Sequence, residues 1–208
     1  MLNIVVFISG GGTNLQALID ACACGEIKNG RIRAILSSRA GAYGLARAKQ
    51  AGIESFTLPR KAYPSADDYC AALSALLRPL KPDLLVLAGF LCVLTPAFCD
   101  EYQHRILNVH PALIPAFCGD GFYGLRVHEQ ALQRGVKVTG ATVHFVDAVT
   151  DGGPIVLQQA VPVLDGDTAE TLQRRVMEQA EWQLLPQAVD LFCRGKLQLD
   201  GTRVTILP

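Results

Sequence analysis

The chain has 208 residues, half of them hydrophobic, and its 19 basic side chains balance 19 acidic ones. This length allows one domain with a sizeable core, and the neutral balance argues against nucleic acid or an anionic membrane as a partner. The longest apolar runs are the length of strands, which excludes a membrane span. Seven scattered cysteines without a C-x-x-C pair indicate reduced thiols, and Met1–Asn3 lacks the basic start of a signal peptide. We therefore expect a cytoplasmic protein.

The first half of the chain predicts alternating strands and helices. A run rich in β-branched residues predicts a buried strand at 3–8, and the apolar run at 84–88 predicts another. Further strands are expected at 31–37, 53–58 and 106–110, with helices after residue 14 and at 43–51, 65–77 and 96–102. The third of these helices begins with a capping box at Ser65 and Asp68. The alternation predicts an α/β fold with a doubly wound, mostly parallel sheet.

The second half predicts fewer helices and longer strands. We expect a helix at 126–133, strands at 136–146 and 155–161, and a long helix at 168–193 that begins at Asp167. Pro186 should kink or interrupt this last helix. The turn signal Asp200-Gly201 lies between two short apolar runs, which predicts a hairpin in the tail.

A glycine loop, Ser9–Asn14, follows the first predicted strand and precedes the first predicted helix. Glycines let the backbone approach an anion, and a helix N-terminus offers free N–H groups and a partial positive charge. The loop matches neither the dinucleotide fingerprint nor the P-loop pattern. A plain tight turn is the alternative, but we favour phosphate binding by Gly12, Thr13 and Asn14.

Two polar residues end the strand at 106–110. Asn108 and His110 are two residues apart, so their side chains point to the same side of the strand, at the edge where ligands gather in open α/β sheets. An amide donor and an imidazole suit the stabilisation of an oxyanion and the movement of a proton. A capping Asn and a structural His remain the alternative. The loop 147–154 should reach the same edge, where Asp151 could pair with His110 or simply shape an Asp-Gly-Gly turn.

These motifs together resemble a known family. Ile8–Gln16, Leu87–Phe90, Leu107–Pro115, Thr139–Val146 and Asp151–Ile155 are similar to segments of the folate-dependent glycinamide ribonucleotide transformylases of purine biosynthesis. The resemblance runs from Asn3 to about Gly195. It implies a single Rossmann-like formyltransferase domain at 1–208, with a phosphate-binding half at 1–100, a catalytic and folate-binding half at 101–195, and a tail hairpin at 196–208.

The resemblance also implies a reaction. A formyl group passes from N10 of 10-formyltetrahydrofolate, the co-substrate, to the primary amine of 5'-phosphoribosylglycinamide, whose phosphate is held by Gly12, Thr13 and Asn14. Asn108 and a protonated His110 would stabilise the tetrahedral intermediate as donors. Asp151 would keep the pKa of His110 high and order a water for proton transfer. No metal is needed, and the expected partners are these two small molecules.

The folate site implied by the resemblance consists of Asn108, the loop Ala148–Asp151 and four residues after the strand at 84–88. These four are Leu91, Cys92, Val93 and Leu94, for which core packing is the alternative. Many relatives have an Arg at the position of Ala66 that contacts the acidic tail of the folate, and Arg60 or Lys61 could take its place. The loop Cys118–Gly124, within the glycine- and proline-containing stretch 116–125, is longer than in the shortest relatives.

The last helix departs from the family pattern by one extra residue within Met177–Trp182. Glu181 is the nearest match to a Glu that touches the amine end of the substrate, with Glu178 as the other candidate and a solvated Glu as the alternative to both. An inserted residue can produce a π-bulge, which is often found at functional sites. We expect His128 and His144 to be structural, and His104 has no motif around it.

Three other functions compete with the transferase. A 10-formyltetrahydrofolate hydrolase would use the same Asn108, His110 and Asp151 with water as the acceptor, but such proteins carry an additional N-terminal domain. A tRNA formyltransferase would need a further C-terminal domain. A non-catalytic nucleotide-binding module would have lost part of the trio, and all three residues are present. The chain could be a monomer or a homodimer.

Overall fold

A nine-stranded sheet forms the centre of the molecule in a computed structural model that describes residues 1–208. The strands lie in the order β3-β2-β1-β4-β5-β6-β7-β9-β8. Their bounds are β1 Leu2–Ile8, β2 Gly30–Ser37, β3 Ser55–Thr57, β4 Leu84–Leu87, β5 Ile106–His110, β6 Val138–Phe145, β7 Ile155–Pro162, β8 Leu197–Asp200 and β9 Arg203–Ile206. The predicted strands all form, and the third is shortened to three residues.

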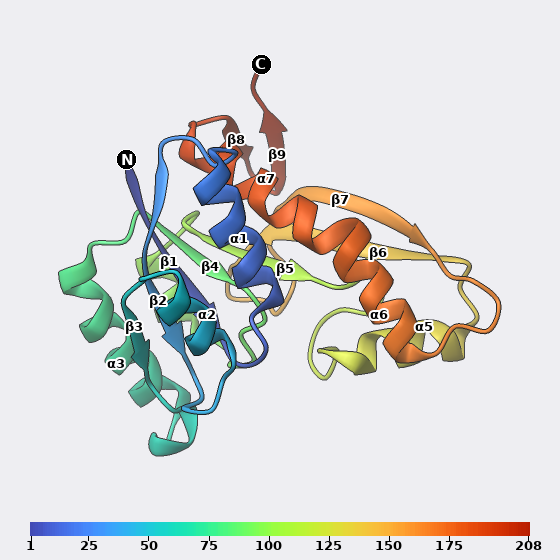
Figure 1. Ribbon diagram of the computed structural model, residues 1–208, viewed down its shortest axis with the longest axis horizontal. Helices are drawn as coiled ribbons and strands as arrows, with labels where there is room; N and C mark the ends of the chain where they lie inside the picture. Colours follow the sequence, from blue (N-terminus) through green and yellow to red (C-terminus); the bar gives the residue numbers. More distant parts are fainter.

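Helices cover both faces of the sheet, as expected of a doubly wound fold. They are α1 Thr13–Cys24, α2 Gly44–Gln50, α3 Ala66–Leu77, α4 Pro96–Glu101, α5 Leu125–Arg134, α6 Ala169–Val176 and α7 Trp182–Cys193. Figure 1 shows α1 beside α7, in contact with it, and α3 at the far left. Alternate residues of β1 enter two different cores, because successive side chains of a strand point to opposite faces: Ile4 and Val6 pack with α1 and α7, and Val5 and Phe7 with α3.

The sheet is parallel in one half and mostly antiparallel in the other. β1 pairs in parallel with β2 and β4, and β5 continues this pattern beside β4. β6 then runs antiparallel to both β5 and β7, and the hairpin β8–β9 joins β7 through one parallel pair. The prediction of a mostly parallel sheet and of the tail hairpin is confirmed. The antiparallel β6–β7 pair follows from the short helix-free loop that joins the two strands, since a parallel return needs a longer crossover.

Helix α3 begins at the predicted N-cap, Ser65, but the reciprocal bond of the predicted capping box, from the Ser65 backbone N–H to the Asp68 side chain, does not form. The Ser65 hydroxyl accepts a hydrogen bond from the backbone N–H of Asp68 at 3.0 Å and donates to the carboxylate of Asp68 at 2.6 Å. These contacts satisfy one of the free N–H groups of the first turn and place a negative charge near the positive end of the helix dipole.

The predicted long helix at 168–193 differs from the expectation in two respects. Thr168, rather than Asp167, is its N-cap and forms a capping box with Thr171. The interruption falls in the π-helical segment Met177–Glu181 rather than at Pro186, which lies inside α7. Pro186 is tolerated because the wider π turn just before it has already disturbed the regular hydrogen-bond ladder. The inserted residue therefore produces the predicted π-bulge.

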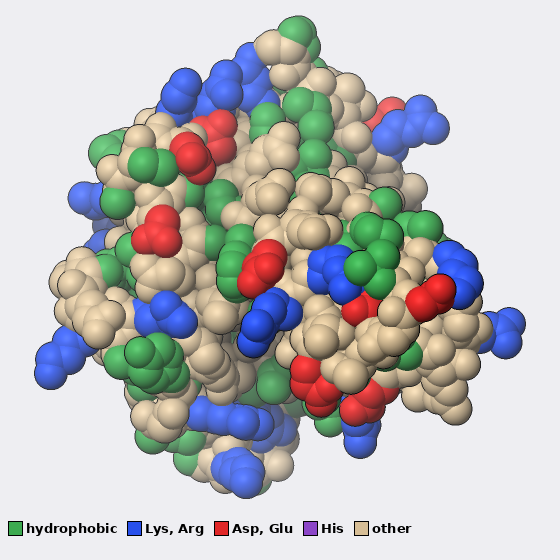
Figure 2. All heavy atoms as spheres, turned by 45° about the vertical axis from the view of Figure 1, so that its right-hand side comes forward, with side chains coloured by type: hydrophobic (Ala, Val, Ile, Leu, Met, Phe, Trp, Pro, Cys, Tyr) green, Lys and Arg blue, Asp and Glu red, His purple; other side chains and the backbone are tan.

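Side chains of both charges lie on the face of the molecule that carries α6 and α7. On the face shown in Figure 2, Lys and Arg side chains are interspersed with Asp and Glu, in keeping with the neutral balance of the sequence. None of the helices has the length and apolar character that crossing a membrane requires.

Candidate active site

One cavity of about 630 Å³ lies at the carboxyl ends of β1, β4 and β5. The three loops that the sequence analysis placed at one sheet edge all line it. The lining consists of Gly10–Asn14, Leu87–Leu94, Asn108–Pro111, Gly119–Gly124 and Val146–Asp151, together with His128, His144, Gln173, Met177 and Glu181. The residues proposed for the phosphate, the reaction and the pterin all lie on this cavity, as does Glu181, whereas Arg60, Lys61 and Glu178 do not.

The carboxylate of Asp151 lies at the centre of the polar group. Its Oδ2 is 3.5 Å from Nδ1 of His110, and its Oδ1 is 3.5 Å from the amide nitrogen of Asn108 and 3.6 Å from Nε2 of His144. The backbone N–H of Gly119 donates to Oδ2 at 2.9 Å. Burial would raise the pKa of Asp151, but the imidazoles and the Gly119 N–H outweigh it, so the pKa lies below its usual value. Asp151 is therefore ionised at neutral pH.

His110 is buried, and its protonation differs from the expectation. Its Nε2 lies 2.8 Å from the carbonyl oxygen of Phe117, which can only accept, so Nε2 carries a hydrogen and Nδ1 faces Asp151. Burial lowers the pKa of His110 below its usual value, although Asp151 and the Phe117 carbonyl oppose the effect. Asp151 does raise the pKa of His110, as expected, but burial outweighs this effect, so the pKa is not held above its usual value. The contact with Asp151 is too long to offset the cost of a buried charge.

His144 belongs to the site, contrary to the prediction that it is structural only. It is the cross-strand neighbour of Asn108 in the antiparallel β5–β6 pair. Its Nδ1 donates to the carbonyl oxygen of Phe145 at 2.8 Å, so in the neutral ring Nε2 accepts a hydrogen bond from the Asn108 amide at 3.1 Å. His144 thus fixes which way the Asn108 amide points. The sequence held no local signal for this, because the signal is the register of two strands.

His128 also lies on the cavity, although it was expected to be structural. It is fully buried on α5, and neither ring nitrogen has a hydrogen-bond partner. Burial, with a smaller contribution from His110, lowers the pKa of His128 to about 4. The ring is therefore neutral and adds no charge to the cavity at neutral pH.

The glycine loop opens the N-terminus of α1 toward the cavity. Gly12 is the N-cap in a left-handed conformation with φ 71°, and no side chain caps the helix. The backbone N–H groups of Gly12, Thr13, Asn14 and Leu15 have no acceptor in the structure. A Cβ at Gly12 would lie 2.7 Å from the Cα of Gly44, so both the conformation and the space require glycine. Such an uncapped helix start is suited to an anion.

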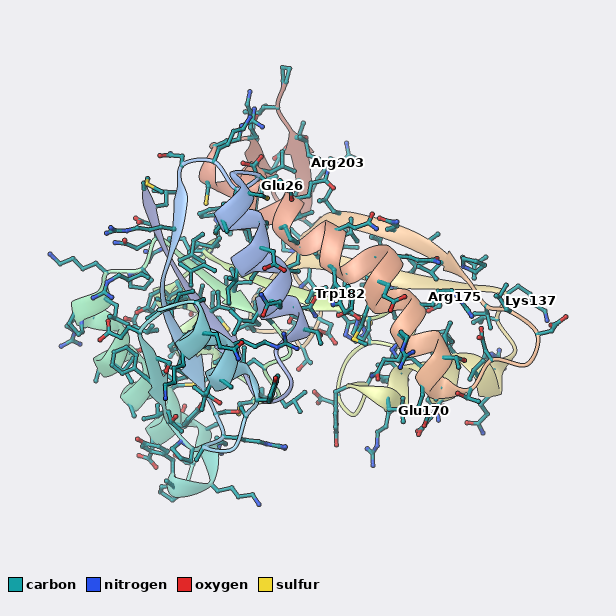
Figure 3. The ribbon with its side chains drawn as sticks, viewed as in Figure 1. Glu26, Lys137, Glu170, Arg175, Trp182 and Arg203 are labelled. Atoms are coloured by element: carbon teal, nitrogen blue, oxygen red, sulfur yellow. The ribbon has the colours of Figure 1, made fainter.

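Glu181 reaches the cavity from the π-helical segment. Figure 3 labels Trp182, the next residue, where that segment passes into α7. The carboxylate of Glu181 accepts a hydrogen bond from the Asn14 amide at 2.6 Å, and the other amide atom of Asn14, Oδ1, is buried without a partner. Burial raises the pKa of Glu181 to about 7, with Asn14 opposing the effect. Glu178, the other candidate, is exposed and away from the cavity.

The raised pKa of Glu181 predicts a pH-dependent stability. The folded state binds the proton of Glu181 more tightly than the unfolded state does. Protonated Glu181 therefore contributes about 3 kcal/mol to the free energy of unfolding. This contribution is fully present below pH 4.5 and is lost as the pH rises through about 7. In Glu181→Gln this dependence should disappear, so that the variant is more stable than the parent at pH 8. Urea unfolding at pH 5 and pH 8 measures it, with the exposed Glu178→Gln as control. Equal pH slopes in all three proteins would contradict the prediction.

The residues proposed for the folate differ in burial. Leu91 and Val93 are 50% and 66% exposed at the mouth of the cavity, whereas Leu94 is buried in the core beside α3 and α4. Cys92 is intermediate and also lines the cavity. Core packing therefore accounts for Leu94 and not for Leu91 or Val93. Ala66, Arg60 and Lys61 lie outside the cavity lining.

The loop 116–125 contacts the polar group directly. Besides the Phe117 and Gly119 contacts described above, the carboxylate of Asp120 accepts a hydrogen bond from the Thr150 hydroxyl at 2.9 Å. The loop is thereby connected to the loop that carries Asp151. No group of three or more His, Cys, Asp or Glu side chains is arranged to hold a metal ion.

Comparisons with known proteins agree with this geometry. The model of the formyl transferase family matches residues 2–189. The phosphoribosylglycinamide formyltransferase of Escherichia coli (strain K12) is 44% identical, over 98% of this chain and 96% of its own. The crystal structure of glycinamide ribonucleotide transformylase 1 from Symbiobacterium toebii is 47% identical, with a TM-score of 0.93 over 100% of this chain and 95% of its own. A formyltetrahydrofolate deformylase from Pseudomonas syringae, 24% identical with a TM-score of 0.88 over 100% of this chain and 66% of its own, shares the fold. Because the family model matches residues 2–189 and the two formyltransferases are matched over nearly their whole length, the chain belongs to the formyl transferase family.

Proposed function

We propose that this protein transfers the formyl group of 10-formyltetrahydrofolate to the amine of 5'-phosphoribosylglycinamide, a cytoplasmic step of purine biosynthesis. The observation that carries the proposal is that one cavity holds both an uncapped helix start and the Asn108–His110–Asp151 group. The first suits a phosphate and the second suits acyl transfer to an amine. The similarity to phosphoribosylglycinamide formyltransferases over nearly the whole chain supports the same substrates.

The ribonucleotide would bind between the glycine loop and the π-helical segment. Its phosphate would accept hydrogen bonds from the free N–H groups of Gly12, Thr13 and Asn14. The carboxylate oxygens of Glu181, a residue that also lines the cavity, are acceptors next to Asn14 of this loop. Acceptors in that place are suited to hydroxyl and amine hydrogens, which the ribose and the glycinamide both supply.

The folate would bind at the other end of the cavity. The exposed side chains of Leu91 and Val93 and the loop Ala148–Asp151 border that end. Apolar side chains with backbone groups between them suit a flat heterocycle that has both a face and hydrogen-bonding edges. The formyl-bearing nitrogen would then lie near Asn108, between the proposed folate and phosphate positions.

The chemistry follows from the arrangement around Asp151. The substrate amine attacks the formyl carbon, and the Asn108 amide donates a hydrogen bond to the oxygen as it gains negative charge. The amine proton passes to Nδ1 of His110, which is free in the neutral ring, and Asp151 stabilises the imidazolium that forms. When the bond from carbon to N10 breaks, the same proton passes to N10. Neither step calls for a metal ion.

Purified protein with both substrates tests the proposal. We expect the folate absorbance to change only when 5'-phosphoribosylglycinamide is present, with one N-formyl ribonucleotide formed for each tetrahydrofolate. Folate turnover without the ribonucleotide would instead identify a 10-formyltetrahydrofolate hydrolase. Saturable binding of the ribonucleotide without any turnover would identify a non-catalytic nucleotide-binding module.

A further inference from the structure

The cavity that should receive a phosphate contains no positively charged side chain. Neither Lys nor Arg is present among its lining residues, whereas Asp120, Asp147, Asp151 and Glu181 are. All four are carboxylates outside the glycine loop, and those that are ionised would repel a phosphate dianion over the short distances of a cavity. Free N–H groups supply only partial charges. A compensating cation has to come from just outside the lining.

Arg47 of α2 is a cation in contact with the glycine loop. Its Nε donates to the carbonyl oxygen of Gly11 at 3.0 Å, and its Nη1 donates to the side-chain oxygen of Gln16 at 3.0 Å. The guanidinium also lies over the ring of Tyr43, 5.2 Å from the ring centroid. All of these partners are neutral, and Arg47 takes part in none of the ion pairs of the structure. Its positive charge is therefore not neutralised by the protein.

The contact with Gly11 fixes the first peptide of the glycine loop whose N–H is proposed to bind the phosphate. Gly11 O and Gly12 N belong to one peptide unit, which is trans, so the carbonyl and the N–H point in opposite directions. Arg47 thus binds the carbonyl side of the peptide unit whose N–H is free. Gly12 also lies close to Gly44 and to the Arg47 side chain: a Cβ at Gly12 would be 3.5 Å from Cδ of Arg47. These contacts restrict the movement of the same peptide unit.

We propose that Arg47 is a positioning residue for the phosphate of the substrate, an inference that rests on the proposed function. It acts through the Gly11–Gly12 peptide in two ways. It holds the Gly12 N–H in the direction of the phosphate, and its unneutralised charge behind the peptide polarises that N–H and offsets the carboxylates of the cavity. Arg47 therefore determines the preference for a phosphorylated substrate without taking part in formyl transfer.

The test compares Arg47→Met, Arg47→Lys and Lys49→Met with the parent. Lys49 is an exposed cation on the same helix, so its loss changes the net charge equally without touching the loop. Each protein is assayed with 5'-phosphoribosylglycinamide and with the corresponding ribonucleoside, which lacks the phosphate. The dissociation constant of ribose 5-phosphate is measured by calorimetry at low and high salt, and thermal unfolding shows that each variant is folded.

We expect Arg47→Met to raise both the KM for the ribonucleotide and the dissociation constant of ribose 5-phosphate about tenfold at low salt. The kcat, the KM for the folate and the kinetics with the ribonucleoside should not change, Arg47→Lys should recover most of the loss, and Lys49→Met should match the parent. An unchanged dissociation constant in folded Arg47→Met, or an equal loss with the ribonucleoside, would overturn the inference and leave the proposed function intact. If the parent protein binds neither 5'-phosphoribosylglycinamide nor ribose 5-phosphate, the inference about Arg47 and the proposed function are both contradicted.

Discussion

Asp151→Asn is expected to lower kcat for formyl transfer about a thousandfold, within the range for loss of general acid–base catalysis. The amide keeps the size of the carboxylate but cannot stabilise a proton on Nδ1 of His110, and the pKa of His110, already lowered by burial, should fall further. The KM values should change little, because the carboxylate acts on a charge that develops only during the reaction. Steady-state kinetics measure the effect, and NMR titration of His110 measures the pKa.

Asp120→Asn is the matched control for this variant. Asp120 lines the same cavity and is exposed, and its carboxylate contacts the Thr150 hydroxyl rather than His110. Its replacement removes one negative charge from the cavity while leaving the polar group around Asp151 in place, so kcat should stay within a fewfold of the parent. If Asp151→Asn kept a tenth of the parent kcat, or if both variants lost activity equally, Asp151 would not have the role proposed.

Gly153→Ala is expected to lower the free energy of unfolding by about 3 kcal/mol, the upper end of the usual cost of overpacking. A Cβ at this buried glycine would lie 1.9 Å from the carbonyl oxygen of Phe145 and 2.9 Å from its carbon. These are backbone atoms at the end of β6, which cannot turn aside as a side chain can. Relief requires moving the strand end or the turn, and the turn carries Asp151 two residues earlier. Activity should therefore fall together with stability.

Urea unfolding of Gly153→Ala and of Gly41→Ala measures the stability effect. Gly41 is exposed and lies outside the left-handed region, and a methyl group added there would meet no atom within 4 Å, so its replacement should change stability by less than about 0.5 kcal/mol. A parent-like midpoint for Gly153→Ala would show that the turn can rearrange without cost, and the close packing described here would then be unimportant for stability.

Most of the fold could be predicted because its signals are local. The β-branched run of β1, the N-cap at Ser65 and the turn at Asp200-Gly201 each occupy a few adjacent residues, and each forms as expected. The antiparallel direction of β6 was not predicted, because strand direction is decided by how the connections cross the sheet. The interruption of the last helix was assigned to Pro186 as well as to the extra residue, and the structure shows it only at the extra residue.

The site was predictable to the extent that it lies at strand ends. Asn108 and the glycine loop end parallel strands, which brings them to one edge whatever the rest of the chain does. The place of His144 depends instead on the register between β5 and β6, which no local pattern encodes. The lowered pKa of His110 depends on burial by a loop that begins seven residues later with Phe117. Such effects arise only when distant segments pack together.

The pairing of Asn108 with His144 across β5 and β6 has a consequence for motion in the protein. Both residues belong to central strands whose flanking residues, Leu107 and Val143, are fully buried, so separating them requires opening the core itself. Amide hydrogens there should exchange only through global unfolding, whereas the loops that carry Gly119 and Thr150 can open at a small fraction of that free energy. The proposed donor to the oxyanion, Asn108, would thus be held by the part of the molecule that opens most slowly, while the proposed substrates would enter and leave past the loops that open most readily.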